Sequence, residues 1–245
     1  MRTSVDRILG KIGSYFTRRP IVGGSTPILG SFPPYNELCR IGSRNNYFIH
    51  DGYAHRLVPQ YFNDTTNSDG WQDEVYRFAR EIADGYDLRS VLDIGCGSGF
   101  KLLKYLHDRT TIGIDVAETC ALLQKRYPGR QWAISDFAAQ KAPQADLVIA
   151  SDVIEHLADP DALLQYIVRV DPQYVVVSTP DRNLLRSRTH NGPPFNPMHL
   201  REWSMAELHA YVSEFLEIIE HFTSYAPQAT QCVLAKPRSV RVLER

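Results

Sequence analysis

From residue 71 onward, the hydrophobic positions of the chain follow two alternating periods. Short apolar runs that suit buried strands alternate with segments whose apolar residues recur at the spacing of one helix face. The pattern predicts helices over 72–84, 99–107, 118–127, 160–169 and 205–213, and strands over 90–95, 111–115, 131–135, 146–151, 174–179, 216–224 and 229–236. This alternation indicates a parallel sheet that is covered by helices on both faces.

Residues at the ends of these elements support the assignment. Asp159 before Pro160 is typical of a helix N-cap followed by proline at the first helical position, and Ser204 with Glu207 forms a capping-box pattern. The last two strands are separated by a short Ala-Pro turn, which predicts an antiparallel hairpin. We therefore expect an α/β, Rossmann-like, doubly wound fold with a mostly parallel seven-stranded sheet and a C-terminal antiparallel hairpin.

Residues 1–70 show little sustained periodicity and are rich in Pro, Gly, Arg, Asn and Tyr. We interpret them as an N-terminal extension, followed by one domain at 71–238 and a tail at 239–245. Within the extension, the apolar residues of 4–17 fall on one face of a helix, with basic residues around it. Such a helix can lie on an anionic membrane surface. Docking on its own domain or on the partner of a homodimer is the favoured alternative.

Composition and charge narrow the class of protein. The 245-residue chain has 43% hydrophobic residues and a formal net charge of −1, which gives no general electrostatic reason to bind nucleic acid. Its four cysteines include no CxxC pair, which argues against a disulfide framework or a zinc site and favours a reducing cytoplasm. No apolar run approaches the ~18 residues of a membrane span, and no signal-peptide core is present. We predict a cytoplasmic protein without integral membrane contact.

The segment 91–103, VLDIGCGSGFKLL, reads as a strand, a glycine turn and a helix, which is how α/β proteins seat an adenosine-containing cofactor. Its glycines follow the spacing GxGxG, with Phe100 where the dinucleotide fingerprint GxGxxG has its third glycine. Asp93 stands at the carboxyl end of the strand. A pyrophosphate about 4 Å from Asp93 would be repelled by on the order of 4 kcal/mol at an effective dielectric of 20. A ligand with an ammonium and a sulfonium reverses that sign, so the loop favours S-adenosylmethionine.

Three further motifs follow in order, namely GIDV at 113–116, SDF at 135–137 and SDVIEHL at 151–157. With the glycine loop, they resemble the motifs of class I S-adenosylmethionine-dependent methyltransferases, and STPDR and NPMHLREWS further on are similar to the bacterial branch that acts on small metabolites, quinone precursors and sugars. The resemblance implies a set of cofactor-binding residues: Asp93, Gly95, Cys96, Gly97, Gly99, Asp115, Val116, Asp136, Phe137 and Ser151. It also implies that Trp71, Gln72 and Tyr76 complete the pocket, although this aromatic cluster equally suits a plain core. Asp136 has the alternative of capping the next segment.

Candidate catalytic residues are His199, His156 and Asp152. An alcohol must lose a proton near the transition state of methyl transfer, and an imidazole is a suitable base near neutral pH. A structural His199 that bonds a backbone carbonyl is an equal alternative. In quinone-precursor O-methyltransferases, an element similar to Asp152, Glu155 and His156 can hold magnesium. Hydrogen bonds that orient the loop are the favoured interpretation here, so we expect no metal.

The long connection 180–203 contains Arg182, Arg186, Arg188 and Arg201. These arginines either recognise phosphate or carboxylate on the acceptor or are solvated surface charges. The sequence predicts methyl transfer from S-adenosylmethionine, which leaves S-adenosylhomocysteine, to an oxygen or nitrogen of a small-molecule acceptor. An anionic sugar or nucleotide-sugar type metabolite is the favoured acceptor. The alternatives are an NAD-dependent oxidoreductase and a catalytically silent, partner-binding protein with the same fold.

Overall fold

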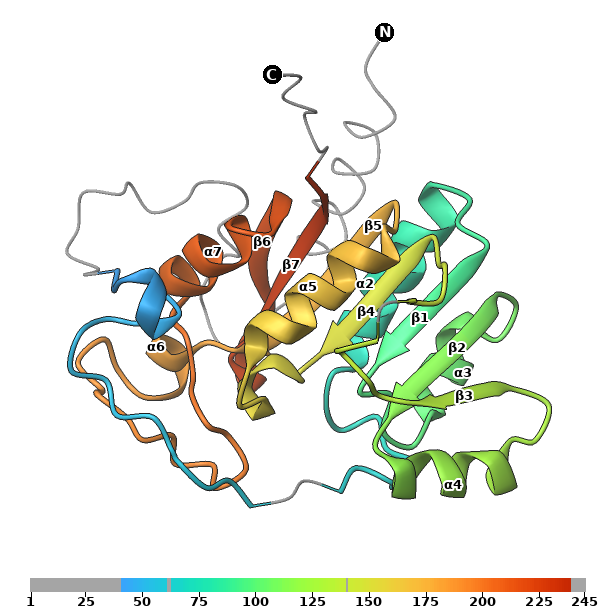
Figure 1. The fold of residues 1–245 in the computed structure, drawn as a ribbon, viewed down its shortest axis with the longest axis horizontal. Coiled ribbons are helices and arrows are strands. Elements are labelled where there is room, and N and C mark those ends of the chain that lie inside the picture. Colours follow the sequence, from blue (N-terminus) through green and yellow to red (C-terminus); the bar gives the residue numbers. More distant parts are fainter. Residues whose placement is uncertain (1–40, 61–62, 140, 239–245) are drawn as a thin grey trace, which may run out of the picture. The chain divides into compact units, whose positions relative to one another are not determined.

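The computed structural model describes residues 41–60, 63–139 and 141–238, so the predicted helix at 4–17 and the tail at 239–245 lie outside the described residues. Its seven strands form one sheet in the order β3-β2-β1-β4-β5-β7-β6 (Figure 1). The five parallel strands are β1 (Ser90–Ile94), β2 (Thr110–Asp115), β3 (Gln131–Ile134), β4 (Leu147–Ser151) and β5 (Tyr174–Pro180). The strands β6 (Leu216–Tyr225) and β7 (Thr230–Pro237) are antiparallel to each other, and β7 is antiparallel to β5. The predicted fold class is confirmed.

Helices connect the strands where the sequence predicts them. The long helices are α2 (Asp73–Gly85), α3 (Phe100–Leu106), α4 (Ala117–Arg126), α5 (Pro160–Val170) and α7 (Met205–Ser213). Asp159 caps α5 by accepting from two backbone N–H groups, and Ser204 with Glu207 forms the complete capping box of α7. The described residues also contain elements that the periodicity does not predict, namely α6 (Arg182–Leu185) and the 3-10 turns η1 (Arg44–Asn46), η2 (Ile154–His156) and η3 (Ala226–Gln228).

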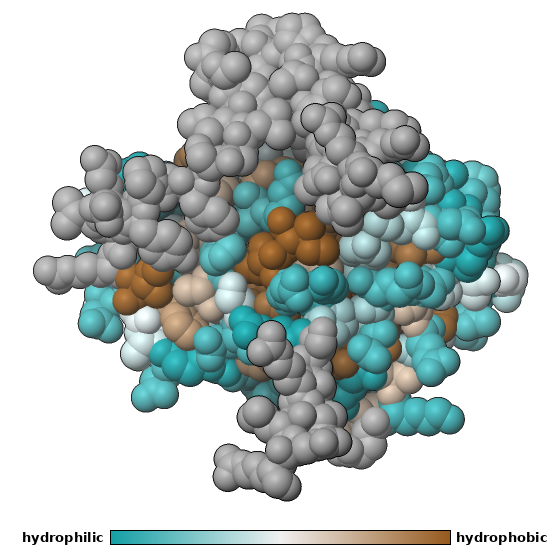
Figure 2. Space-filling model, turned by 90° about the horizontal axis from the view of Figure 1, so that it is seen from above, coloured by the Kyte–Doolittle hydropathy of each residue, from teal (hydrophilic) through white to brown (hydrophobic). Residues whose placement is uncertain are grey.

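The centre of the sheet holds the core. Val91 and Leu92 on β1, Val148 on β4 and Val176 and Val177 on β5 have at most 1% of their surface exposed. Burying one such side chain contributes about 1.5–3 kcal/mol, so these runs determine which strands lie inside the sheet. On the face shown in Figure 2, hydrophobic residues of the described part form separate patches between hydrophilic ones. None of the helices in the described ranges is long and apolar enough to cross a bilayer.

The order of the strands brings the predicted motifs together. Ile94 at the end of β1 lies beside Ile114 of β2 on one side and Ala150 of β4 on the other. The carboxyl ends of parallel strands share one edge, and the order of the strands reverses between β1 and β4. Such a switch point is where open α/β sheets bind their ligands. The segments after β1, β2, β3 and β4 therefore meet at this edge.

Part of the predicted N-terminal extension is built into the described structure. Ile49 and Tyr53 belong to the buried core. Backbone N–H groups of this segment donate to the long loop after β5, from Ala54 to Asn191 O at 2.7 Å and from Gln60 to Pro197 O at 2.9 Å. Figure 1 shows the two segments side by side, in blue and orange. The boundary at residue 70 stays a prediction, and these contacts indicate that the segment before it supports the loop.

Candidate functional site

A cavity of about 420 Å³ opens at the carboxyl edge of the sheet. One end is formed by Gly95, Gly97, Asp115 and Val116, and the other by Ser151, Asp152 and His156. Its remaining wall includes Pro59, Gln60, Asp64 and Gln72, from the chain before α2, and Met198 from the long loop. Ser135 and Met198 stand inside the predicted motifs, although neither was named as a site residue, and Pro59, Gln60, Asp64 and Thr119 were not expected.

The glycine loop adopts a backbone that other residues disfavour. Gly95, Gly97 and Gly99 have φ angles of 69°, 52° and 68°, in the left-handed region that glycine enters without steric cost. A Cβ on Gly95 would lie 2.5 Å from Val153 Cγ2, and one on Gly97 would lie 2.8 Å from Asp64 O. The chain thus needs glycine here for its own backbone conformation and packing.

Not every residue of the loop reaches the cavity. Gly95 and Gly97 line it, whereas Gly99 is the N-cap residue of α3 and a Cβ there would meet Trp132 at 2.8 Å. Cys96 is buried, and burial raises the pKa of its thiol well above the usual range. The structure therefore places Cys96 and Gly99 in the packing of the loop rather than in the wall of the cavity.

Asp115 at the end of β2 contacts two other parts of the cavity wall, the glycine loop and Val116. Its Oδ2 accepts the N–H of Gly97 at 2.8 Å, and its Oδ1 accepts the N–H of Val116 at 2.7 Å. Each carboxylate oxygen has a further lone pair. Asp115 lines the cavity and can therefore accept ligand hydroxyls while it holds the glycine loop.

The third motif divides between two roles. Phe137 lines the cavity, as does Ser135. Asp136 is absent from the lining, and its Oδ1 accepts the N–H of Ala138 at 3.0 Å. This contact is the capping that the sequence offered as the alternative for Asp136.

Asp93 is fully buried and is likewise absent from the lining of the cavity. The hydroxyl of Tyr76 lies 3.1 and 2.9 Å from its two oxygens. Burial raises the pKa of Asp93 to about 7, against the opposing effect of the Tyr76 hydrogen bond. Of the three residues that the resemblance adds to the pocket, Gln72 lines it, Tyr76 supports Asp93 and Trp71 is 65% exposed.

The other end of the cavity concentrates titratable groups. Asp152 has a φ of 53°, a left-handed conformation that is uncommon for a residue with a side chain. Its Oδ1 accepts the hydroxyl of Ser178 at 2.7 Å, and burial raises the pKa of its carboxyl group. Glu155 is fully buried. Its Oε2 accepts the hydroxyl of Thr179 at 2.9 Å, whereas its Oε1 has no hydrogen-bond partner among the described residues. Burial, followed by the charge of Asp152, raises the pKa of Glu155.

Two imidazoles adjoin these carboxyl groups. His156 Nδ1 lies 2.9 Å from the carbonyl oxygen of Met198, so Nδ1 is the donor. Its Nε2 lies 4.0 Å from Glu155 Oε1, and burial lowers the pKa of His156. The rings of His156 and His199 meet edge to face with centroids 4.8 Å apart. The structure thus brings together the three predicted catalytic residues, although His199 does not itself line the cavity.

Glu155, His156 and His199 are also arranged as metal ligands. One donor atom from each lies within 4.8 Å of the others. A set of two imidazoles and one carboxylate suits zinc, manganese or iron(II) better than magnesium, which prefers oxygen ligands. Oε1 of Glu155, which has no hydrogen bond among the described residues, fits such an ion, because a buried carboxylate oxygen without a hydrogen bond is costly. The motif in the sequence offered Asp152 in place of His199 for this set, because spacing along the chain does not show that the loop returns here.

The arginines of the long loop separate into two groups. Arg182 is 2% exposed and forms an ion pair with Glu207 at 2.7 Å. Arg201 is buried and donates to the carbonyls of Leu157 and Ala158. Neither interpretation from the sequence, anion recognition or solvated surface charge, describes these two residues. Arg186 and Arg188 are exposed.

Comparison with known proteins agrees with this site. A family model described as a methyltransferase domain matches residues 60–229. Among solved structures, the methyltransferase domain of bacterial CtHen1-C is 21% identical, with a TM-score of 0.53 over 69% of this chain and 99% of that one. A Burkholderia thailandensis 1,6-didemethyltoxoflavin-N1-methyltransferase, solved with S-adenosylhomocysteine, is 18% identical, with a TM-score of 0.51 over 70% of this chain and 82% of that one. No curated protein sequence matches the chain.

The [4+2]-cyclase SpnF is similar too, with 17% identity and a TM-score of 0.52 over 75% of this chain and 88% of that one. Fold similarity at this level therefore does not determine the reaction. The family model covers more than half of the chain, and on that basis the chain belongs to the methyltransferase family. It is an S-adenosylmethionine-dependent methyltransferase, and this membership replaces the alternative of an NAD-dependent oxidoreductase.

Proposed function

We propose that the enzyme transfers the methyl group of S-adenosylmethionine to a hydroxyl or amine of a small-molecule acceptor. The observation that carries this proposal is the cavity, which joins an adenosine-type cofactor end at Gly95, Gly97 and Asp115 to potential bases at Asp152 and His156. His199 packs against the ring of His156 behind the cavity wall. Ser151, the last residue of β4, lines the cavity beside Asp152. The acceptor would enter beside Met198 and Gln60, at the long loop.

The reaction is a displacement at carbon. A lone pair of the acceptor forms the new bond to the methyl carbon, the carbon–sulfur bond breaks, and its electron pair returns to sulfur to give S-adenosylhomocysteine. The enzyme aligns nucleophile, methyl and sulfur, which is the contribution of proximity. For a hydroxyl acceptor, the proton passes to an imidazole. His156 suits this role because burial lowers its pKa and so favours the neutral, proton-accepting form.

A divalent cation, when bound by Glu155, His156 and His199, would act as a Lewis acid that lowers the pKa of an acceptor hydroxyl. The chain's own residues would then supply the ligands and exclude water. The burial of Glu155 and the contact of His156 with the Met198 carbonyl orient the donors without an ion. A bound cation and a free imidazole base would therefore serve the same purpose, which is to help an acceptor hydroxyl lose its proton.

The identity of the acceptor stays a hypothesis. An anionic sugar or nucleotide-sugar type metabolite is supported by the exposed Arg186 and Arg188, since the loop from Arg182 to Arg201 contains no acidic residue. Arg182 and Arg201 do not support it, because both are engaged internally. Formation of a homodimer also stays a hypothesis, which rests on the sequence alone.

The function is tested by following labelled methyl from S-adenosylmethionine into a panel of catechols, amines, sugar phosphates and nucleotide sugars, with and without Mn²⁺. We expect one acceptor class to become labelled by the wild-type enzyme and by the exposed control variant His107→Gln. We expect His156→Gln and His199→Gln to retain cofactor binding and to lose most of the transfer. Methyl transfer by these two variants at the wild-type rate would contradict the assignment of His156 and His199 as bases.

A further inference from the structure

Both ring nitrogens of His199 have a hydrogen-bond partner in the structure. Nδ1 lies 2.8 Å from Oε1 of Glu202, and Nε2 lies 2.8 Å from Nδ2 of Asn196. His199 is almost fully buried, so these two partners rather than solvent decide which nitrogen carries the proton.

The amide of Asn196 can be oriented from its other contact. Its Oδ1 lies 3.0 Å from the backbone nitrogen of Met198, and a backbone N–H only donates. The amide oxygen must therefore face Met198, which leaves the NH₂ group facing His199. An NH₂ group only donates as well, so Nε2 of His199 must be the acceptor in this contact.

Glu202 leads independently to the same assignment. Its carboxylate is fully buried, and an ionised carboxylate only accepts. Nδ1 of His199 must then carry the proton that lies between them. Oε1 of Glu202 contacts His199, and Oε2 has no hydrogen-bond partner among the described residues. Within those residues, His199 is therefore the one hydrogen-bond partner of this carboxylate. Two neighbours on opposite sides of the ring thus require one and the same tautomer.

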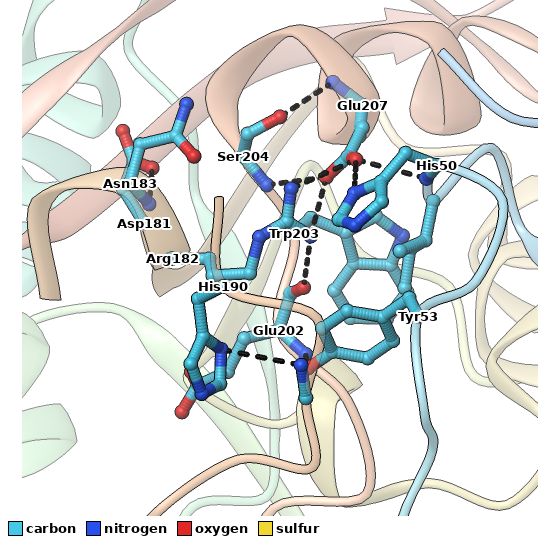
Figure 3. A network of polar contacts seen from close by, with 12 residues as sticks. His50, Tyr53, Asp181, Arg182, Asn183, His190, Glu202, Trp203, Ser204 and Glu207 are labelled. Atoms are coloured by element: carbon cyan, nitrogen blue, oxygen red, sulfur yellow. Dashed lines mark hydrogen bonds and ion pairs between the residues drawn. The ribbon is translucent and has the colours of Figure 1, made fainter. Parts of the chain in front are cut away.

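Glu202 is itself held in place through its backbone, as Figure 3 shows. Its N–H donates to the hydroxyl of Tyr53 at 3.0 Å, and its carbonyl accepts from Arg182 at 3.0 Å. Arg182 is in turn fixed by the buried carboxylate of Glu207, which also accepts from His50. The segment with His50 and Tyr53, helix α6 and helix α7 therefore together hold the backbone of Glu202.

We propose that Asn196 and Glu202 are positioning residues that hold His199 as the Nδ1–H tautomer, so that Nε2 is the nitrogen whose lone pair serves the reaction. This inference rests on the proposed function for its catalytic meaning, while the tautomer is a property of the free protein. Asn196 occupies the same lone pair, so a substrate hydroxyl or a cation that uses Nε2 replaces the Asn196 amide. Asn196 and Glu202 were not among the site residues predicted from the sequence, whereas His199 was.

The test is long-range ¹H–¹⁵N NMR of the histidine rings at pH 8, with the signals of His199 assigned by their loss in His199→Gln. In the wild-type protein we expect the Nδ1–H pattern. Glu202→Gln keeps an acceptor oxygen and should retain that pattern, as should the exposed control Glu217→Gln. Glu202→Leu removes the acceptor and should move the main population toward Nε2–H. Asn196→Asp replaces the donor with an acceptor and should place a proton on Nε2.

An Nε2–H pattern in the wild-type protein, or an unchanged pattern in Asn196→Asp, would overturn the proposal. If Glu202→Leu does not fold, as judged by circular dichroism, the spectra of the wild-type protein and of Asn196→Asp still determine which tautomer of His199 is present. Calorimetric titration with S-adenosylhomocysteine is run on the same samples. Neither positioning residue lines the cavity, so we expect affinities within twofold of wild type. If the wild-type protein does not bind S-adenosylhomocysteine, the proposed function is contradicted, whereas the result on the His199 tautomer is unaffected.

Discussion

The carboxylate of Asp115 and the backbone N–H of Gly97 are joined by a hydrogen bond of 2.8 Å. This contact links the end of β2 to the glycine loop after β1, across the edge where the cavity opens. One side chain thus holds the loop and lines the cavity. A ligand bound in the cavity would share this carboxylate with the loop.

Replacing Asp115 with Ala should weaken the binding of S-adenosylhomocysteine by about 10- to 100-fold, because hydrogen bonds to a charged group contribute about 1.5–3 kcal/mol. Calorimetric titration measures the change. Glu118→Gln is the matched control, since Glu118 is an exposed carboxylate in the first turn of α4. The assignment fails if both variants bind like the wild-type protein.

Asp93 should make the stability of the protein depend on pH. The pKa of its carboxyl group is about 7 when folded, against an ordinary value of about 3.9, so the folded state keeps a proton that the unfolded state has lost. The contribution of this group to the free energy of unfolding therefore falls by up to about 4 kcal/mol as the pH rises from about 4 to about 7. Above about pH 7 this contribution no longer changes. The comparison is urea unfolding of the wild-type protein and Asp93→Asn across this range. Parallel curves for the two proteins would show that Asp93 does not have this pKa.

Arg182 should contribute to stability rather than to acceptor affinity. Arg182→Ala leaves the buried Glu207 without its arginine partner and should lower the free energy of unfolding by about 3–5 kcal/mol. Arg186→Ala, at an exposed position of the same loop, should change it by less than about 0.5 kcal/mol. Chemical denaturation gives both values. Equal stability of the two variants would contradict the ion pair.

The donor group Glu155, His156 and His199 should bind a transition-metal ion. We expect Co²⁺ to give a visible absorption band with the wild-type protein and with His107→Gln, and to give none with His156→Gln or His199→Gln. Glu155→Gln should weaken the binding by removing the charged ligand. If Co²⁺ produces no band with the wild-type protein, the cluster acts through its imidazoles as bases.

The sequence predicted the strands, the long helices and the sheet edge correctly, because short apolar runs and helix caps are local signals. Asp115 and the glycine loop stand at the ends of these predicted strands, and Asp115, Gly95 and Gly97 line the cavity. Asp64 was missed because its role depends on segments that meet from distant parts of the chain. Asn196 and Glu202 stand three residues to either side of His199 within NPMHLREWS, but an irregular loop has no periodicity from which their contacts with His199 could be predicted. Arg182 was misread for a related reason: its partner, Glu207, lies on α7, and no local pattern links the two. Asp136 shows the limit of motifs, since its neighbours line the cavity and it does not.

The most direct test of the account is calorimetric titration of the wild-type protein with S-adenosylhomocysteine, with NADH as the comparison. The account predicts one binding site per chain for S-adenosylhomocysteine and no heat of binding for NADH. Absence of S-adenosylhomocysteine binding at high micromolar concentration, or binding of NADH in its place, would contradict it.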